Sequence, residues 1–161
     1  MEVHPAVTAA LERLGAEYEV LPCDPELADT LRFCEAYGFA LEDSANTILV
    51  ASKRPPGRLA ACVVLASTRL DVNHSVKAHL GVRRLSFASP ETTLEVTGME
   101  IGGVTPFGLG AELPVLIDSR VPTRERVVVG AGTRTAKIRC RPDVLTRLPS
   151  AEVVEGLAFV P

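Results

Sequence analysis

The sequence has no tryptophan, and aromatic residues make up only 4% of its 161 positions. Recognition of several nucleic-acid bases by stacking is therefore not expected, since each stacked base needs its own aromatic platform. Long apolar runs are missing too. The longest, 59–66, has eight residues, whereas about 18 are needed to cross a bilayer. Because no basic and then apolar leader opens the chain, the sequence predicts neither a membrane protein nor a secreted precursor.

Paired cysteine motifs are also lacking. Cys23, Cys34, Cys62 and Cys140 show no C-x-x-C spacing and no nearby pair of histidines, so neither structural zinc nor a disulfide framework is indicated. Cys62 lies within an apolar stretch, where a free cysteine acts as a small hydrophobic residue. We expect buried, reduced thiols in a cytoplasmic protein.

The formal charge of −3 hides a strong segmentation. Residues 53–84 carry seven basic residues against one acidic residue, and residues 120–147 carry eight against two. The segments before and between these blocks are acidic. If the two basic blocks share a face, they form a surface for a polyanion such as nucleic acid. The alternative is that the charges are spread over a solvated surface.

Start and stop signals predict a mixture of helices and strands. Proline at first-turn positions, capping residues and terminal glycines predict helices over about 5–14, 30–38, 73–81, 90–98 and 141–149. Runs rich in β-branched residues predict strands at 18–21, 47–51, 61–65, 114–118, 126–129, 136–140 and 153–160. Because the two kinds of element do not alternate strictly, we expect a single α+β domain over residues 1–161 with a mixed sheet.

Two glycine-rich segments are the most informative stretches. Residues 98–108 contain four glycines and a proline, and 130–137 contain two glycines, two hydroxyl side chains and two cations. Exposed amide groups in such a turn can hold an anion or a developing oxyanion, and the second composition suits phosphate contacts. Both segments can equally be tight structural connections between strands.

Together these segments resemble the YbaK/EbsC family, which is related to the editing domain inserted in some bacterial prolyl-tRNA synthetases. The resemblance extends over nearly the whole chain, and its most specific part is the T-G-x-x-x-G-G-V-T-P-F-G string at 97–108. It implies a mixed, barrel-like β-sheet flanked by helices. It also implies a trans-editing hydrolase that removes a wrong, small amino acid from tRNA without a metal or other cofactor. The implied partner is the 3′ aminoacyl end of tRNA, with an aminoacyl-tRNA synthetase or a second copy of the chain as further partners and no membrane.

This interpretation assigns roles to individual residues. An ester is already activated, so the site needs mainly positioning and stabilisation of an oxyanion, for which the amides of Gly102 and Gly103 are the candidates. Water would be oriented by Asn46, by a threonine hydroxyl (Thr47 or Thr105) or by the ribose of the substrate. Pro106 and Phe107 would shape a small pocket. Asp118 would either orient the site or be an exposed acid at a strand end or turn, and Asp29 would either belong to the site or cap the helix that follows it. The expected contacts to the 3′-end phosphates are Gly132, Thr133, Arg134 and Lys137, with Arg83 and Arg84 as outer contacts.

One departure from the family keeps other functions open. The family often has a lysine at the start of the strand where this chain has Asn46, and the nearest lysine is Lys53. A catalytically silent module of the same fold that binds tRNA or a nucleotide-like ligand is therefore an alternative. A third is a hydrolase or binder of a small free aminoacyl-type compound.

Overall fold

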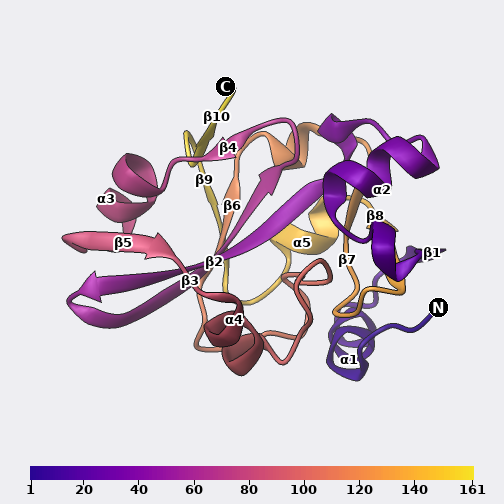
Figure 1. Ribbon diagram of the computed structural model, residues 1–161, viewed down its shortest axis with the longest axis horizontal. Helices are drawn as coiled ribbons and strands as arrows, with labels where there is room; N and C mark the ends of the chain where they lie inside the picture. The colour runs from indigo at the N-terminus through magenta and orange to yellow at the C-terminus, as the bar shows by residue number, and fades with distance from the viewer.

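The computed structural model describes residues 1–161, and its largest sheet has five strands in the order β5-β2-β3-β6-β9. β2 (Ala45–Arg54) and β3 (Pro56–Leu65) form a long antiparallel hairpin, and β5 (Arg84–Phe87) pairs with the outer half of β2. β6 (Val115–Asp118) and β9 (Ala151–Val154) extend the sheet in parallel. The tip of the hairpin projects from the molecule beside β5 (Figure 1).

A second, antiparallel sheet has the order β1-β8-β7. Its strands are β1 (Tyr18–Pro22), β7 (Val127–Gly130) and β8 (Ala136–Cys140). A parallel bridge between Ser44 and Val128 joins it to the start of β2. The two sheets therefore curve around one interior, and the expected α+β fold with a mixed, barrel-like sheet is confirmed.

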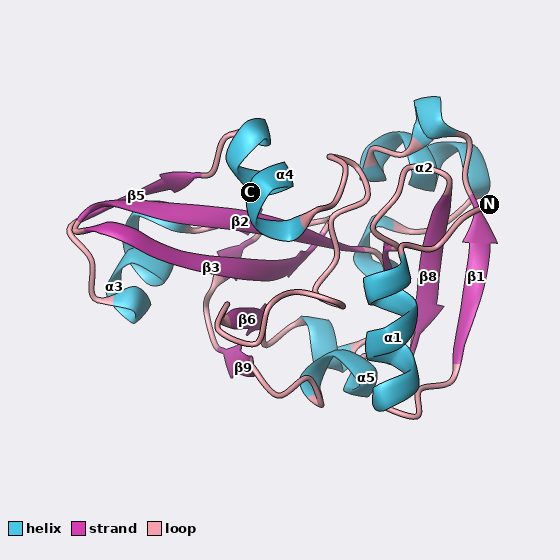
Figure 2. Ribbon diagram, turned by 90° about the horizontal axis from the view of Figure 1, so that it is seen from below, coloured by secondary structure: helices cyan, strands magenta, loops and turns pink.

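The helices begin and end where capping chemistry places them. They are α1 (Pro5–Arg13), α2 (Thr30–Tyr37), α3 (Lys77–Leu80), α4 (Pro90–Thr97) and α5 (Asp143–Thr146). The Ser89 hydroxyl accepts the Thr92 amide at the start of α4, as an N-cap serine should. Helix α4 ends at Gly98, whose φ of 70° suits a glycine at this position. Figure 2 shows α4 on one side of the β2–β3 hairpin, with α1 and α5 on the other.

Alternation along β2 and β3 separates two cores. Leu49 and Val63 belong to a core of 22 buried residues that includes α1 and both sheets. Val50 and Val64 belong to a core of 13 residues that includes Leu80 of α3. Because successive strand residues point to opposite faces, both faces of this part of the sheet are covered.

Three expected elements differ in the structure. The strand expected over 153–160 is interrupted at Gly156, which has a φ of 73°, so that β9 is followed by the short β10 (Ala158–Phe159) paired with β4 (Arg69–Leu70). The helix expected over 73–81 begins with a π-helix over Val72–Val76, capped by Asp71 rather than by Asn73. The last helix, α5, is shorter than the expected 141–149. No helix has the length and apolarity that a membrane span requires.

Asp118 holds the C-terminal hairpin instead of lining a site. Its side chain is fully buried at the end of β6, where it accepts the amides of Arg120 and Ala158 and pairs with the Arg120 guanidinium at 3.5 Å. Buried amides need such partners. The expectation that Asp118 orients the site is therefore corrected to a structural role.

We expect Asp118→Ala to lower the free energy of unfolding by about 3 kcal/mol, because it leaves the buried Ala158 amide and the Arg120 amide without their charged acceptor. Urea unfolding followed by circular dichroism measures this. Asp143→Ala is the control, since its pair with Arg141 is exposed on both sides and should contribute less than about 1 kcal/mol. Equal, small effects of the two variants would contradict the role given to Asp118.

Candidate functional site

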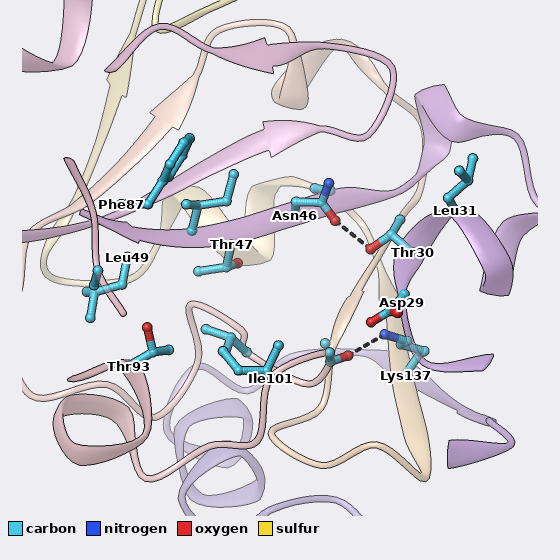
Figure 3. Close-up of a pocket in the computed structure, with 16 residues that line it drawn as sticks. Asp29, Thr30, Leu31, Asn46, Thr47, Leu49, Phe87, Thr93, Ile101 and Lys137 are labelled. Atoms are coloured by element: carbon cyan, nitrogen blue, oxygen red, sulfur yellow. Dashed lines mark hydrogen bonds between the residues drawn. The ribbon is translucent and has the colours of Figure 1, made fainter. Parts of the chain in front are cut away.

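A cavity of about 390 Å³ lies at a gap in the edge of β2. On this edge, β7 forms a single bridge to Ser44, the residue just before β2. β5 pairs with β2 from Val50 outwards, and the Ala88 amide after β5 donates to the Leu49 carbonyl. Between these points the residues Asn46, Thr47 and Ile48 pair only with β3. All three line the cavity (Figure 3). A strand edge without a neighbour offers free backbone groups to a ligand.

The walls of the cavity come from four further parts of the chain. The start of α2 contributes Asp29, Thr30 and Leu31, and β5 with the residues after it contributes Phe87, Ala88 and Thr93. The glycine-rich loop contributes Ile101, Gly102 and Val104, and the second sheet contributes Gly130 and Lys137. Half of the lining residues are hydrophobic. Such an apolar hollow with a few converging polar groups is the usual form of a small-molecule site.

Lys137 is the buried cation of the cavity. Its side chain is 5% exposed, and its Nζ donates to the carbonyls of Ala28 at 2.6 Å and Gly102 at 2.7 Å. The ammonium also lies 5.6 Å from the centre of the Phe33 ring. An ammonium has three N–H donors, so one remains for a ligand. The residue belongs to the inner wall of the cavity and not to an exposed phosphate-contacting surface, which corrects its expected role.

The environment of Lys137 lowers the pKa of its ammonium group. Burial lowers its pKa below 10.5, and the nearby Arg134 adds to this, whereas Cys23, Asp29 and Cys34 oppose it. Desolvation penalises the charged form of a lysine. The two carbonyl contacts compensate part of that cost in the charged state.

The glycine-rich loop offers two free amides, but they are not the expected pair. The Gly103 amide donates to the Glu100 carbonyl at 2.9 Å, so the expectation that it serves an oxyanion is wrong. Gly102 and Val104 both line the cavity, and their amides have no hydrogen-bond partner in the protein. The amides of this loop that remain without a protein partner beside the cavity are therefore those of residues 102 and 104.

The two glycine-rich segments pack against each other. A Cβ at Gly130 would lie 2.5 Å from the carbonyl oxygens of Gly103 and Val104, and one at Gly103 would lie 2.3 Å from the Thr133 carbonyl oxygen. Only glycine permits so close an approach of two backbones. The glycines at these positions thus serve backbone packing, while Gly102, with a φ of 90°, also faces the cavity.

The remaining residues of the second glycine segment are used internally. The Thr133 hydroxyl donates to the Glu2 carbonyl, and the Arg134 guanidinium donates to the carbonyls of Pro25 and Ile101. A Cβ at Gly132 would lie 2.5 Å from the His4 Cβ. None of Gly132, Thr133 and Arg134 lines the cavity. Their expected phosphate contacts are replaced by contacts that hold the loops around it.

The expected pocket-shaping residues lie in the core. Phe107 and Thr105 are completely buried, Pro106 is buried as well, and none of the three lines the cavity. Phe107 belongs to the larger core. The side chains that shape the cavity beside this loop are Ile101 and Val104 instead.

Asn46 and Thr47 both line the cavity. The Asn46 carbonyl oxygen accepts the Thr30 hydroxyl of α2 (Figure 3), which leaves its amide nitrogen without a partner in the protein. The Thr47 hydroxyl is buried and has no hydrogen-bond partner. A buried hydroxyl of this kind is expected to meet a water or a ligand group.

Asp29 is a cavity residue to which the sequence assigns no definite role. It stands at the N-cap position of α2, but its side chain makes no capping hydrogen bond. The carboxylate lies 3.7 Å from the Arg134 guanidinium and at the cavity wall. Its place at the helix start allowed two interpretations in the sequence, capping or site, and the missing cap bond favours the second.

The two basic blocks differ in whether their cations are paired within the protein. In residues 120–147, most guanidinium groups are paired within the protein, for example Arg124 with Asp43 and Arg139 with Glu19. In residues 53–84, no lysine or arginine side chain forms an ion pair or a hydrogen bond. Five of these free cations gather at the hairpin tip and the start of β5: Lys53, Arg54, Arg58, Arg83 and Arg84. The two blocks therefore do not form one common footprint.

Comparison with known proteins identifies the family. Residues 24–148 match the model of the aminoacyl-tRNA editing domain, and the chain belongs to this family, which includes YbaK. A curated relative, the uncharacterized protein YwhH of Bacillus subtilis, is 28% identical over 137 residues and is covered to 85%, as is this chain.

Solved structures share the fold along almost the whole chain. The hypothetical protein APE2540 has a TM-score of 0.84 at 22% identity, with 96% of this chain and 99% of that chain covered. A protein described as a candidate trans-editing enzyme for prolyl-tRNA synthetase has a TM-score of 0.79 at 25% identity, with 96% and 98% covered. The family resemblance seen in the sequence is thus confirmed.

The depressed pKa of Lys137 predicts a pH-dependent stability difference between the wild type and Lys137→Met. Between the lowered pKa of the folded state and 10.5, the unfolded chain binds more protons, so the lysine's contribution rises with pH and is complete above 10.5. The stability of the wild type relative to the variant should therefore grow as pH rises towards 10.5.

Urea unfolding of both proteins over a pH series measures this difference. Burial raises the pKa of Cys62 and of Cys140 to about 12, which lowers the stability of both proteins alike above about pH 9. The comparison with Lys137→Met removes that shared contribution. A difference that stays constant or shrinks with rising pH would contradict the lowered pKa.

Proposed function

We propose that the protein hydrolyses the ester of a misacylated tRNA that carries a small, uncharged amino acid. The observation that carries this proposal is the cavity at the β2 gap, where a buried ammonium and unpartnered amides meet an apolar wall. Family membership supports the substrate class. The ammonium inside the cavity disfavours a cationic acyl side chain, because like charges repel in a poorly solvated space.

In this proposal the acyl group enters the cavity with its carbonyl oxygen towards Gly102 and Lys137. A water adds to the carbonyl carbon, and the negative charge on the oxygen is stabilised by the third N–H of Lys137 and the Gly102 amide. The bond to the ribose oxygen then breaks. The departing oxygen takes the proton that the water loses, which gives a free amino acid and a tRNA with an intact hydroxyl end.

Three cavity residues have supporting roles. Asp29 is placed to accept the α-ammonium group of the aminoacyl ester, since its carboxylate is free of a capping bond. The Asn46 amide and the Thr47 hydroxyl are the groups that orient the water or the ribose. Lys137 thereby supplies a cation to the site although β2 has Asn46 where the family often has lysine.

A panel of tRNAs charged with alanine, serine, cysteine or threonine tests the activity. We expect loss of the ester from at least one of them, and Lys137→Met should lower kcat/KM by about 100-fold or more, the usual effect of removing an oxyanion donor. Lys77→Met, in which a cation outside the cavity is removed, is the control.

Two results of this assay would contradict the proposal. If no charged tRNA is hydrolysed above buffer while tRNA still binds, the protein is a silent binding module. If hydrolysis in Lys137→Met equals that of the wild type while the variant is folded, the oxyanion role of Lys137 is wrong.

The free cations at the hairpin tip supply the surface for the tRNA backbone. β5 leads from Arg84 at the tip to Phe87 at the cavity, a distance of about 10 Å for three strand residues. A substrate whose acyl end is in the cavity can therefore reach these cations with its adjoining phosphates. Affinity from such contacts is electrostatic and falls with salt.

We expect the triple variant Arg54→Gln, Arg58→Gln, Arg83→Gln to weaken tRNA binding and to reduce the slope of log K against log salt by about 0.7–0.9 for each phosphate that is no longer neutralised. Fluorescence anisotropy of labelled tRNA at several salt concentrations measures the slope. The matched control is Arg139→Gln, Arg141→Gln, Arg147→Gln, which removes the same charge from groups bonded within the protein. Equal slopes for the two variants would contradict the assignment.

A further inference from the structure

A second hollow, of about 650 Å³, lies on the other face of the β2 edge. It shares Asn46, Ile48 and Phe87 with the first cavity. Its other lining residues are Val64 of β3, Phe159 of β10 and the segment from Thr68 to His74. In Figure 3, Phe87 and Asn46 point to one side of β2, whereas Leu49, Thr93 and Ile101 lie on the other. The two hollows thus meet along the unpaired residues of β2.

The second hollow exposes two aromatic rings. Phe87 is 60% and Phe159 is 46% exposed, the highest values of any aromatic residue in the chain, while Phe33 and Phe107 are fully buried. Neither exposed ring stacks on another aromatic residue. In a sequence with so few aromatic residues, two uncovered rings in one hollow indicate a planar or apolar ligand group.

The rim of this hollow is polar. The Arg69 guanidinium has no ion pair or hydrogen bond, and Asn73 stands at the same rim. Asp71 caps the following π-helix, with its carboxylate oxygens bonded to the His74 amide and ring and to the Ser75 hydroxyl. Donors and acceptors around exposed rings match the edge of a nucleobase, which offers both.

We propose that this second hollow binds a base of the 3′-terminal nucleotides of the substrate RNA, stacked on Phe87 or Phe159. The proposal rests on the proposed function, because it places the ester at the shared β2 edge. The acyl group then lies on one face of the sheet and a base on the other. Asn46, which lines both hollows, contacts the ribose between them.

Two features favour an RNA end over a protein partner. The hollow adjoins the acyl cavity, with which it shares three lining residues, so a ligand in one is adjacent to a ligand in the other. Arg69 and the free cations of the hairpin tip belong to the same unpaired basic block. Stacking faces beside a free cation, here Arg69, are among the means by which proteins hold single-stranded nucleic acid.

A short RNA that carries no amino acid (called the uncharged RNA below) tests the stacking. It has a fluorescent adenine analogue, 2-aminopurine, at its last or next-to-last position. Binding to the wild type should quench the fluorescence at one of these positions. Phe87→Ala or Phe159→Ala should remove the quenching and raise Kd by roughly 5- to 100-fold, the range for loss of one base–aromatic stack. Phe87→Tyr and Phe159→Tyr keep a ring and should restore binding.

Tyr18→Ala is the matched control, because Tyr18 is an exposed aromatic residue on β1, in the second sheet. Circular dichroism verifies that every variant is folded. The proposal is overturned if the RNA binds the wild type and both alanine variants with the same Kd and quenching, or if it binds none of them. It is also overturned if the wild type is a dimer that the phenylalanine substitutions dissociate, since a second copy then covers the rings.

The uncharged RNA separates this proposal from the catalytic one. Stacking that depends on Phe87 or Phe159, together with no hydrolysis of any charged tRNA, supports the base site and contradicts the deacylase. Hydrolysis with unchanged KM in both alanine variants supports the deacylase and contradicts the base site.

Discussion

The candidate site depends on one buried ammonium held between two carbonyls. Lys137 on β8 bonds Ala28, just before α2, and Gly102 in the glycine-rich loop. A buried charge without such partners would cost several kcal/mol, so the charged form of Lys137 requires both segments to stand at hydrogen-bond distance from the Nζ. The same contacts fix the separation between two walls of the cavity. The third N–H therefore belongs to a group whose position is already fixed, which is the condition for electrostatic stabilisation without reorganisation.

The gap in the β2 edge has an equally local cause. β5 ends at Phe87, and Ser89 with Pro90 begins α4 two residues later. No strand therefore pairs with β2 on that side at Asn46, Thr47 and Ile48. Alternation along a strand sends Thr47 to one face and its neighbours to the other. A ligand at this edge thus meets both hollows. Because β5 ends before it reaches these residues, two chemically different parts of one substrate can lie on opposite faces of β2.

The sequence predicted the elements better than it predicted the site. Caps and terminal glycines act within a few residues, so α1, α2 and α4 were placed almost correctly, and the 97–108 string indicated the family. The partners of individual groups were not predictable. Whether the Gly103 amide is free depends on Glu100 and on the packing of Gly130 against the loop, and Phe107 is apolar enough for a pocket or for a core. Lys137 was predicted to bind the substrate, but as a contact to phosphates. Its burial was not predictable, because no local sequence pattern shows that Ala28 and Gly102 lie on either side of it.

Charge segmentation carries more information than the net charge suggests. The acidic block 1–52 supplies Glu19, Asp29 and Asp43, and each of them faces an arginine of block 120–147. These two blocks are brought together because β1 pairs with β8 and because α2 lies against the second sheet. Opposite charges in segments that the topology makes neighbours pair with each other, which leaves the block 53–84 without acidic partners. The cationic surface of this protein is therefore the basic block whose charges no acidic segment neutralises in the fold. The net charge of −3 conceals it.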